Sequence, residues 1–168
     1  VAALKEMVEG FRNYARKVSL NLELIDFNDL LKEVLHLYEG MDCTFTTNLS
    51  KMSLPVRVDA TSVRQVLHNL LKNATEAAQE SIHPEINIRT WVKQDKVMVQ
   101  IENNGKGFSA HMLQHAFEPY ITDKAEGTGL GLAVVKKIID EHGGRVHLAN
   151  CADGEGARVT LILSLVHR

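Results

Sequence analysis

Apolar residues recur at the spacing of a helix in five segments of the chain. In residues 1–18 the steps alternate between three and four. That is the heptad pattern of a coiled-coil seam, although one amphipathic surface helix gives the same pattern over so short a length. Asn28 and Asp59 are the expected N-caps of two other helices. The seam begins at the first residue, so the chain looks cut from a longer one. The predicted helices cover 1–18, 28–39, 59–80, 109–116 and 128–141.

Alternation of apolar and polar residues predicts strands between these helices. Residues 86–92 and 97–103 are joined by a short polar turn and should form a hairpin. Residues 19–27 lack a helical pattern and are expected to be a connector. Helices mixed with largely antiparallel strands indicate an α+β fold, a two-layer α/β sandwich with one layer of each. The predicted strands are 43–49, 55–58, 86–92, 97–103, 145–150 and 157–165.

Composition narrows the class of protein. Of 168 residues, 45% are apolar and 24% are charged, which is typical of one folded domain with or without an appendage. The net charge of −2 gives nucleic acid no general attraction. The chain shows no apolar run long enough for a membrane span and no signal peptide. Cys43 and Cys151 are too few for a disulfide framework, and we interpret them as free thiols in a reducing compartment.

Glycine is concentrated in the second half of the chain. Nine of the 11 glycines lie between Gly105 and Gly156, which indicates a binding site there. The run Gly127–Leu132 has glycine at alternate positions and opens a predicted helix, where exposed backbone N–H groups make an anion site. Its spacing matches neither the P-loop nor the dinucleotide-binding fingerprint. A glycine-rich helix start without a ligand is the alternative.

The helix predicted over 59–80 carries a polar ridge beside its apolar stripe. Asn69 and Asn73 lie four residues apart on this ridge, which Gln65, Glu76 and Glu80 share. An asparagine carbonyl is a neutral oxygen ligand suited to Mg²⁺. Taken alone, a solvated polar face is the simpler explanation.

Two loops add to the pattern. Residues Asn103–Gly107 follow a predicted strand directly, and their two glycines let the backbone approach a flat ligand, although a plain turn looks the same. The stretch 109–126 is long for a connection and is expected to contain a mobile lid. It carries the aromatic residue Phe117 and also Lys124, whose charge can meet a phosphate.

In this order, the motifs resemble the nucleotide-binding catalytic domain of bacterial sensor histidine kinases, within the wider family shared with DNA gyrase, Hsp90 and MutL. The resemblance covers about residues 26–168. Residues 11–16, 117–120 and 133–137 look most like nitrogen-regulation kinases of the NtrY type. The matching segments are Asn69–Ala77 (N box), Asn103–Gly107, Gly127–Leu132 and Gly154–Ala157 (three glycine boxes) and Phe117–Lys124 (F box).

The resemblance implies a domain order and a set of partners. Residues 1–18 would be the C-terminal end of a dimerisation and phosphoacceptor helix, 19–27 a linker, and 28–168 the catalytic ATP-binding domain. The partners would be the chain's own dimerisation domain, a second kinase protomer and a response regulator receiver domain. The domain would act in the cytoplasm, as part of a protein anchored in the bacterial inner membrane.

The resemblance also implies roles for single residues. Asn73 would coordinate a Mg²⁺ ion that bridges the ATP phosphates, with Asn69 in support, and Lys124 would reach the triphosphate. The first glycine box would let the chain pass close to adenine. The implied nucleotide-binding residues are Asn69, Asn73, Asn103, Gly105, Gly107, Phe117, Lys124, Gly127, Thr128, Gly129, Leu130, Gly131 and Leu132.

Asn69 stands where hydrolytic relatives have a glutamate that activates water as a general base. The resemblance therefore favours transfer of the γ-phosphoryl group to a histidine over hydrolysis of the gyrase or Hsp90 kind. None of the eight histidines precedes the last dimerisation helix, where the family's acceptor lies. We expect this chain to bind nucleotide without phosphorylating itself.

Asn103 departs from the family pattern, which has an aspartate whose carboxylate accepts a hydrogen bond from the adenine amino group. An amide oxygen can still accept that bond, but it lacks charge assistance, so binding should weaken by about 1–2 kcal/mol. A pseudokinase, which keeps the fold as a regulatory binding module, is the alternative. Glu76 is a second departure, because many relatives have a basic phosphate contact there.

Overall fold

The structure is a computed structural model and describes residues 2–16, 20–124, 127–152 and 155–167. It contains a five-stranded sheet in the order β2-β4-β5-β7-β6 and a separate pair of strands, β1 and β3. The strands are β1 (Leu22–Asp26), β2 (Thr44–Asn48), β3 (Pro55–Asp59), β4 (Glu85–Lys93), β5 (Lys96–Asn103), β6 (Arg145–Asn150) and β7 (Ala157–Ser164). The helices are α1 (Ala2–Ala15), α2 (Phe27–His36), α3 (Ala60–Ala78), α4 (Ala110–His115) and α5 (Gly131–Glu141).

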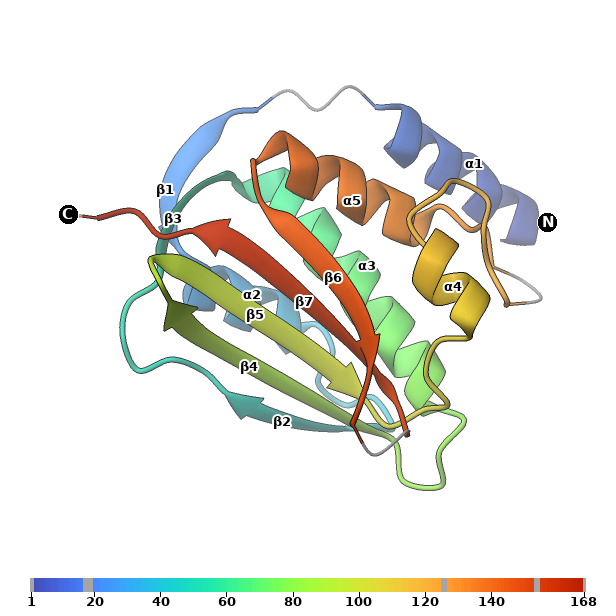
Figure 1. Ribbon diagram of the computed structural model, residues 1–168. Coiled ribbons are helices and arrows are strands. Elements are labelled where there is room, and N and C mark those ends of the chain that lie inside the picture. The colour runs from blue at the N-terminus through green and yellow to red at the C-terminus, as the bar shows by residue number, and fades with distance from the viewer. Residues whose placement is uncertain (1, 17–19, 125–126, 153–154, 168) are drawn as a thin grey trace.

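The two predicted layers are present (Figure 1). Strands β4, β5, β7 and β6 pair antiparallel, and β2 joins the edge parallel to β4. Helix α3 packs against α2 and α5 behind the sheet, and apolar residues of both layers form one core. Residues of β4 alternate between buried and exposed, because only one face of the sheet is covered. The fold is the predicted α+β sandwich.

Helix α3 begins as the sequence predicts. The Asp59 side chain accepts a hydrogen bond from the Ser62 N–H at 2.9 Å, which satisfies one of the unpaired donors at the helix start. The Asp59 backbone N–H donates to Nε2 of His142 at 3.0 Å, so this start is also tied to the end of α5. The polar ridge of α3 is therefore held at a fixed position over the sheet.

Three predicted boundaries are wrong. The N-cap of α2 is Asp26, whose side chain accepts from the backbone N–H of Asn28, and Asn28 lies buried inside the helix. Residues 19–27 are not a plain connector, because Leu22–Asp26 form β1 and pair antiparallel with β3. The last predicted helix begins at Gly131 rather than at 128, since Gly129 has a φ of +72° that a right-handed helix does not allow.

Helix α1 packs against α5 and contains no buried residue. Its apolar side chains Leu4, Met7 and Phe11 are exposed. Lys137 of α5 donates from Nζ to the backbone oxygens of Tyr14 at 2.6 Å and Arg16 at 2.8 Å, next to the C-terminal end of α1. The assignment of residues 1–18 to a dimerisation helix stays a prediction, and residues 17–19 lie outside the described chain. Among the described residues, no helix is long and apolar enough to cross a membrane.

Candidate functional site

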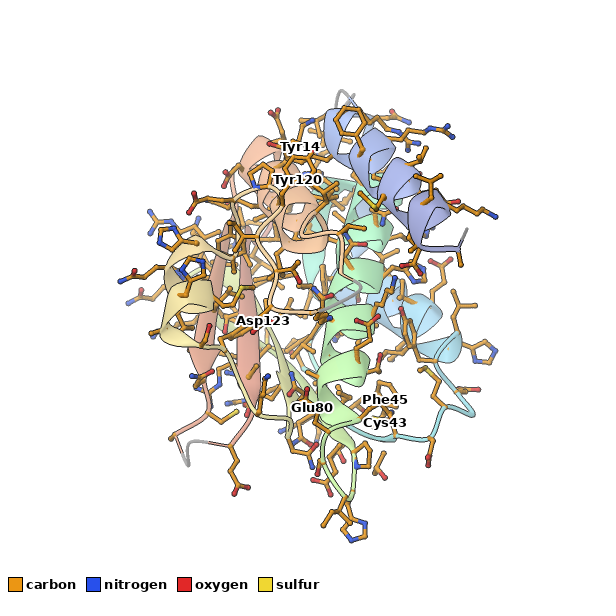
Figure 2. The ribbon with its side chains drawn as sticks, turned by 90° about the vertical axis from the view of Figure 1, so that its right-hand side faces the viewer. Tyr14, Cys43, Phe45, Glu80, Tyr120 and Asp123 are labelled. Atoms are coloured by element: carbon orange, nitrogen blue, oxygen red, sulfur yellow. The ribbon has the colours of Figure 1, made fainter. Side chains whose placement is uncertain are left out.

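The predicted motifs meet in a cleft of about 880 Å³, a volume typical of small-molecule sites. One wall is α3. The others are the loop after β5 (residues 103–108), the lid (described residues 116–124 and 127–130) and the start of α5. Figure 2 looks onto this side of the molecule, with Tyr120 and Asp123 of the lid above Glu80 of the residues that follow α3. Eleven of the 13 predicted residues line the cleft: Asn69, Asn73, Asn103, Gly107, Lys124, Gly127, Thr128, Gly129, Leu130, Gly131 and Leu132.

The other two predicted residues lie behind the surface of the cleft. Gly105 packs so tightly that an added Cβ would lie 2.2 Å from the backbone oxygen of Ala77. Phe117 packs against the hydrophobic core as a partly buried side chain. Both residues shape the cleft without lining it. Gly154 of the third glycine box lies outside the described residues.

The two asparagines of α3 have different surroundings. Asn69 donates from Nδ2 to the backbone oxygen of Gly131 at 3.1 Å, and its Oδ1 accepts from Nε2 of Gln65 at 2.7 Å. It therefore fastens α3 to the start of α5, and its amide has no basic group that could take a proton from water. Asn73 lies one turn further along, and its Nδ2 would be 3.7 Å from a Cβ added at Gly131. Asn73 lines the cleft, and its Oδ1 is a neutral oxygen of the kind that can bind a cation.

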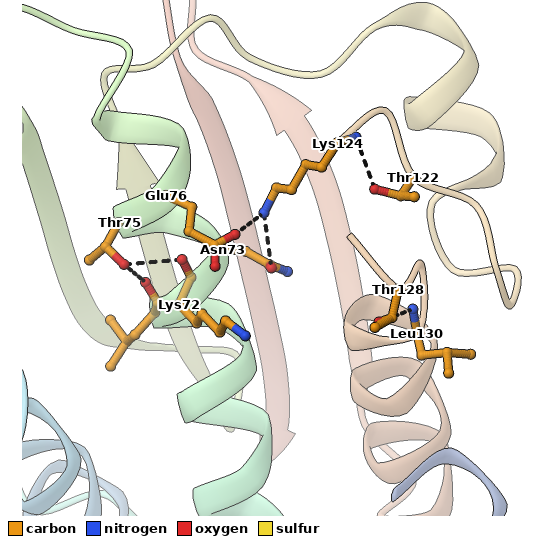
Figure 3. Close-up of polar contacts among 9 residues, drawn as sticks. Lys72, Asn73, Thr75, Glu76, Thr122, Lys124, Thr128 and Leu130 are labelled. Carbon is orange, nitrogen blue, oxygen red and sulfur yellow. Dashed lines mark hydrogen bonds and ion pairs between the residues drawn. The ribbon is translucent and has the colours of Figure 1, made fainter. Parts of the chain in front are cut away.

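A lysine of the lid already reaches that oxygen (Figure 3). Lys124 Nζ lies 3.4 Å from Oδ1 of Asn73 and 2.6 Å from Oε2 of Glu76, and the Lys124 backbone N–H donates to Oγ1 of Thr122 at 3.0 Å. Both partners of the Lys124–Glu76 ion pair are about 40% exposed, at 39% and 44%. The ion pair is therefore screened by water and weak. It nevertheless places one positive charge in the cleft.

The lid returns to α5 through close backbone contacts. Tyr120, which has a φ of +67°, donates its N–H to the backbone oxygen of Gly129 at 2.8 Å. A side chain at Gly129 would collide with the Tyr120 backbone at 2.5 Å. The Leu130 N–H donates to Oγ1 of Thr128, and α5 has no side-chain cap at its first turn. This uncapped start, which faces the cleft, is a favourable place for an anion.

The opposite end of the cleft is the loop 103–108. Asn103 is only 8% exposed, and its Oδ1 accepts a hydrogen bond from the Gly105 N–H at 2.9 Å. Asn150 of β6 holds the loop from outside, because its Oδ1 accepts from the Phe108 N–H at 2.7 Å and its Nδ2 donates to the Phe108 oxygen at 2.9 Å. Gly156 also packs tightly against this loop, because a Cβ added to it would lie 2.0 Å from the backbone oxygen of Asn103.

Sequence reasoning missed several residues of the cleft. Asn150 has no motif of its own, and its partner lies 42 positions away in the chain. Helix α1 was expected only as a dimerisation segment, yet Glu6, Glu9 and Asn13 help to line the cleft. Tyr38 of the residues after α2 also lines it, and its hydroxyl donates to the His68 oxygen at 3.3 Å. Burial, with the negative charge of Glu76, raises the pKa of Tyr38, so this hydroxyl stays neutral and remains a donor.

The described residues of the cleft offer few protein ligands to a cation. No cluster of three or more His, Cys, Asp or Glu side chains that could bind a metal occurs in the part of the chain that the structure describes. Mg²⁺ is commonly bound by one or two protein oxygens, the phosphates of a substrate and several waters. The amide oxygen of Asn73, next to the carboxylate of Glu76, has the chemistry for such a shared site.

Comparison with known proteins identifies the family. The family described as histidine kinase-, DNA gyrase B-, and HSP90-like ATPase matches residues 58–167. The chain belongs to this family. The sensor histidine kinase ZraS of Escherichia coli O157:H7 is 36% identical over 167 residues, which are 95% of this chain and 35% of ZraS. The nitrogen regulation protein NtrY of Azorhizobium caulinodans is 32% identical over 171 residues, which are 97% of this chain and 22% of NtrY.

Solved structures agree with this membership of the ATPase family. The catalytic domain of the histidine kinase ThkA superposes with a TM-score of 0.77 at 32% identity, covering 86% of this chain and 96% of that domain. ThkA in complex with its response regulator TrrA gives a TM-score of 0.83 at 29% identity, covering 98% of this chain and 48% of ThkA. The chain thus spans about a third or less of the curated relatives named above. ZraS and ThkA are named as histidine kinases, and the comparisons do not support the pseudokinase alternative.

Proposed function

We propose that the chain is the ATP-binding catalytic domain of a two-component sensor histidine kinase. It would transfer the γ-phosphoryl group of ATP to a histidine on a dimerisation domain. The observation that carries this proposal is the meeting, in one cleft, of the Asn73 amide oxygen, the Lys124 ammonium group and the uncapped start of α5. These are an oxygen for a cation, a positive charge and a row of N–H donors, which are the groups that a triphosphate needs.

The two ends of the cleft would bind different parts of the nucleotide. The phosphates would lie at the lid end, against the backbone of residues 127–132, with Lys124 released from Glu76 to reach them. A Mg²⁺ ion held at Asn73 would supply neutralisation of phosphate charge. The base would lie at the loop end, where Asn103 and the bare backbone of Gly107 line the cleft.

The surroundings of Asn69 favour transfer over hydrolysis. Both polar ends of its amide are engaged in hydrogen bonds, and neither can act as a general base for water. Phosphoryl transfer depends mainly on positioning and charge neutralisation, and its nucleophile can come from another domain. The domain order supports that arrangement if residues 1–18 end a dimerisation helix, 19–27 link it, and 28–168 form the catalytic domain. The exposed apolar face of α1 is the surface that a second protomer would cover.

The same proposal includes the partners outside the chain. A response regulator receiver domain would take the phosphoryl group from the histidine, and the complex of the relative ThkA with TrrA supports a partner of that kind. We propose that the domain acts in the cytoplasm, attached to a sensor anchored in the inner membrane, by analogy with the sensor kinases to which it is similar.

Calorimetric titration with Mg-ATP tests the proposal. The native chain should bind one nucleotide, and Asn73→Ala should weaken binding at least about tenfold in the presence of Mg²⁺ because a cation ligand is lost. Asn87→Ala, on the exposed face of β4, is the control and should bind as the native chain does. Incubation with γ-labelled ATP and a separate dimerisation domain should then give an acid-labile phosphate on its histidine. An unlabelled histidine domain, or rapid steady-state hydrolysis instead, would contradict the proposal.

A further inference from the structure

The side-chain oxygen of Asn103 already accepts a hydrogen bond within its own loop. Its Oδ1 accepts from the Gly105 N–H at 2.9 Å, two residues along the chain, and the side chain is 8% exposed. An N–H can donate only to the oxygen of an amide, so this contact fixes which way the amide points. Turning the amide over would place its NH₂ group against the Gly105 N–H, donor against donor, in a nearly buried position.

The nitrogen of the same amide is the donor that this side chain can offer to a ligand. Among the described residues, Nδ2 of Asn103 has no hydrogen-bond acceptor, whereas no fully buried side-chain nitrogen or oxygen lacks a partner. Nδ2 is thus open to solvent, and Asn103 lines the cleft. The loop end of the cleft presents a hydrogen-bond donor at the place where the family's aspartate presents an acceptor.

Most other cleft residues at the loop end have no polar side chain that could bond to the edge of a base. The neighbouring cleft residues Ile101, Ala157 and Val159 have aliphatic side chains, and Gly107 has none. Asn150, whose amide supports the same loop, is committed through both of its polar atoms to the backbone of Phe108. Lys106 also lines the cleft, but its side chain is exposed, so Asn103 is the buried polar side chain that can distinguish one purine from another here.

Purines differ in the group at position 6 of the base, which is the group that would face Nδ2 of Asn103. The 6-amino group of adenine is a donor, while the 6-oxo group of guanine or hypoxanthine is an acceptor. We propose that Asn103 sets the base selectivity of this site, so that it accepts 6-oxo purine nucleoside triphosphates at least as readily as ATP. This inference rests on the proposed nucleotide-binding function and concerns only the position-6 contact of the base.

The decisive comparison is between ATP and ITP, which carry the same triphosphate and differ in the position-6 group and the N1 proton that follows from it. Dissociation constants of the two Mg-nucleotides would be measured for the native chain and for Asn103→Asp. We expect the native chain to bind ITP as tightly as ATP or more tightly. The aspartate variant should favour ATP by about tenfold, as expected for exchanging a matched for a mismatched hydrogen bond.

Asn104→Asp is the matched control, because it makes the same change of charge one residue away. Asn104 does not line the cleft, and it bonds instead to the backbone of Glu85 and His83. The ratio of its dissociation constants for ATP and ITP should equal that of the native chain.

A native chain that favours ATP tenfold, as we expect of Asn103→Asp, would mean that Oδ1 accepts from Gly105 and adenine together. That result would overturn the inference about the base but not the proposed function. Failure of the native chain and both variants to bind either nucleotide would overturn the proposed function with it.

Discussion

The two ends of the cleft are built from different kinds of contact. At the loop end, Gly105 and Gly156 bring backbone against backbone at distances that no side chain could share, and Asn150 holds Phe108 through two hydrogen bonds. At the lid end, Gly129 also packs tightly against the Tyr120 backbone, but the lid is joined to α3 by Lys124 through one half-exposed ion pair with Glu76. Backbone packing of this density has one arrangement, whereas a solvated ion pair is exchanged at little cost. The loop end therefore has its shape before a ligand arrives, and the lid end can reorganise around one.

Adding a methyl group at each end of the cleft should reveal the largest difference in stability between the two ends. In Gly105→Ala the new Cβ would lie 2.2 Å from the Ala77 oxygen, and backbone on both sides must move. We expect the free energy of unfolding to fall by about 3 kcal/mol or more. The nearest atom to the new Cβ of Gly131→Ala, at the lid end, is 3.7 Å away, so its stability should change by less than about 1 kcal/mol. Equal losses in denaturant unfolding of the two variants would contradict the distinction.

The start of α3, the wall that both ends share, should give a pH-dependent loss of stability. Burial alone would raise the pKa of Asp59, but hydrogen bonds from the backbone N–H groups of Asn21 and Ser62 outweigh it and hold the pKa below its usual value. The stabilisation is therefore present above the unfolded-state pKa, which is about 3.9, and is lost as the pH falls through the lower folded-state value.

In Asp59→Asn this dependence should be weaker. The variant should be about 1 kcal/mol less stable than the native chain at pH 7, and the difference should shrink as the pH falls below about 4. Denaturant unfolding at a series of pH values measures both quantities. A difference that stays constant from neutral to acid pH would show that the Asp59 carboxylate is not what holds the helix start.

Removing the outer support of the loop should have a smaller effect that is confined to that end. Asn150→Ala deletes both hydrogen bonds to Phe108, which are exposed to water, and should lower the free energy of unfolding by about 1 kcal/mol. Mg-ATP binding should weaken several-fold, while binding of Mg-tripolyphosphate, which has no base, should not change. Asn87→Ala is the control for both titrations. Equal weakening of the two ligands would place the effect at the lid end instead.

The smallest expected effect concerns the ion pair of the lid. In Glu76→Gln, Lys124 loses its carboxylate partner, and one negative charge leaves the phosphate end of the cleft. Stability should change by less than about 1 kcal/mol, since exposed pairs contribute little. Mg-ATP should bind about threefold more tightly at low salt, and the gain should shrink as salt screens it. Glu80→Gln makes the same charge change one turn further on. If Glu76→Gln weakened binding, Glu76 would be a ligand of the cation rather than a partner of Lys124.

Much of the fold could be predicted from local signals in the sequence. Helix α3 begins at Asp59, as its cap and apolar stripe indicate, and the hairpin of β4 and β5 follows from alternation around a polar turn. Strand β1 escaped prediction because it depends on pairing with β3, whose partner residues lie 29 to 37 positions away. The start of α5 was placed too early, because a glycine run says nothing about which glycine takes a positive φ.

The candidate site divides in the same way. Asn69, Asn73 and the glycine run 127–132 could be found from spacing, because one helix face and one helix start fix their positions. The hydrogen bond from the Gly105 N–H to Asn103, which decides which atom faces a ligand, is a matter of side-chain rotamer. The contact of Asn150 with Phe108 joins two segments that carry no shared pattern. Such tertiary contacts become visible only in the folded chain.

Hydrogen exchange of the native chain, measured with and without saturating Mg-ATP, tests the central claim most directly. The account predicts that nucleotide slows exchange strongly at the lid and at the start of α5, where phosphate binding must rebuild contacts. Amides of the loop 103–108 should already be protected in the free protein and should change little. The result that would contradict the account is a free protein whose loop exchanges as fast as its lid, with both ends becoming protected together when nucleotide binds.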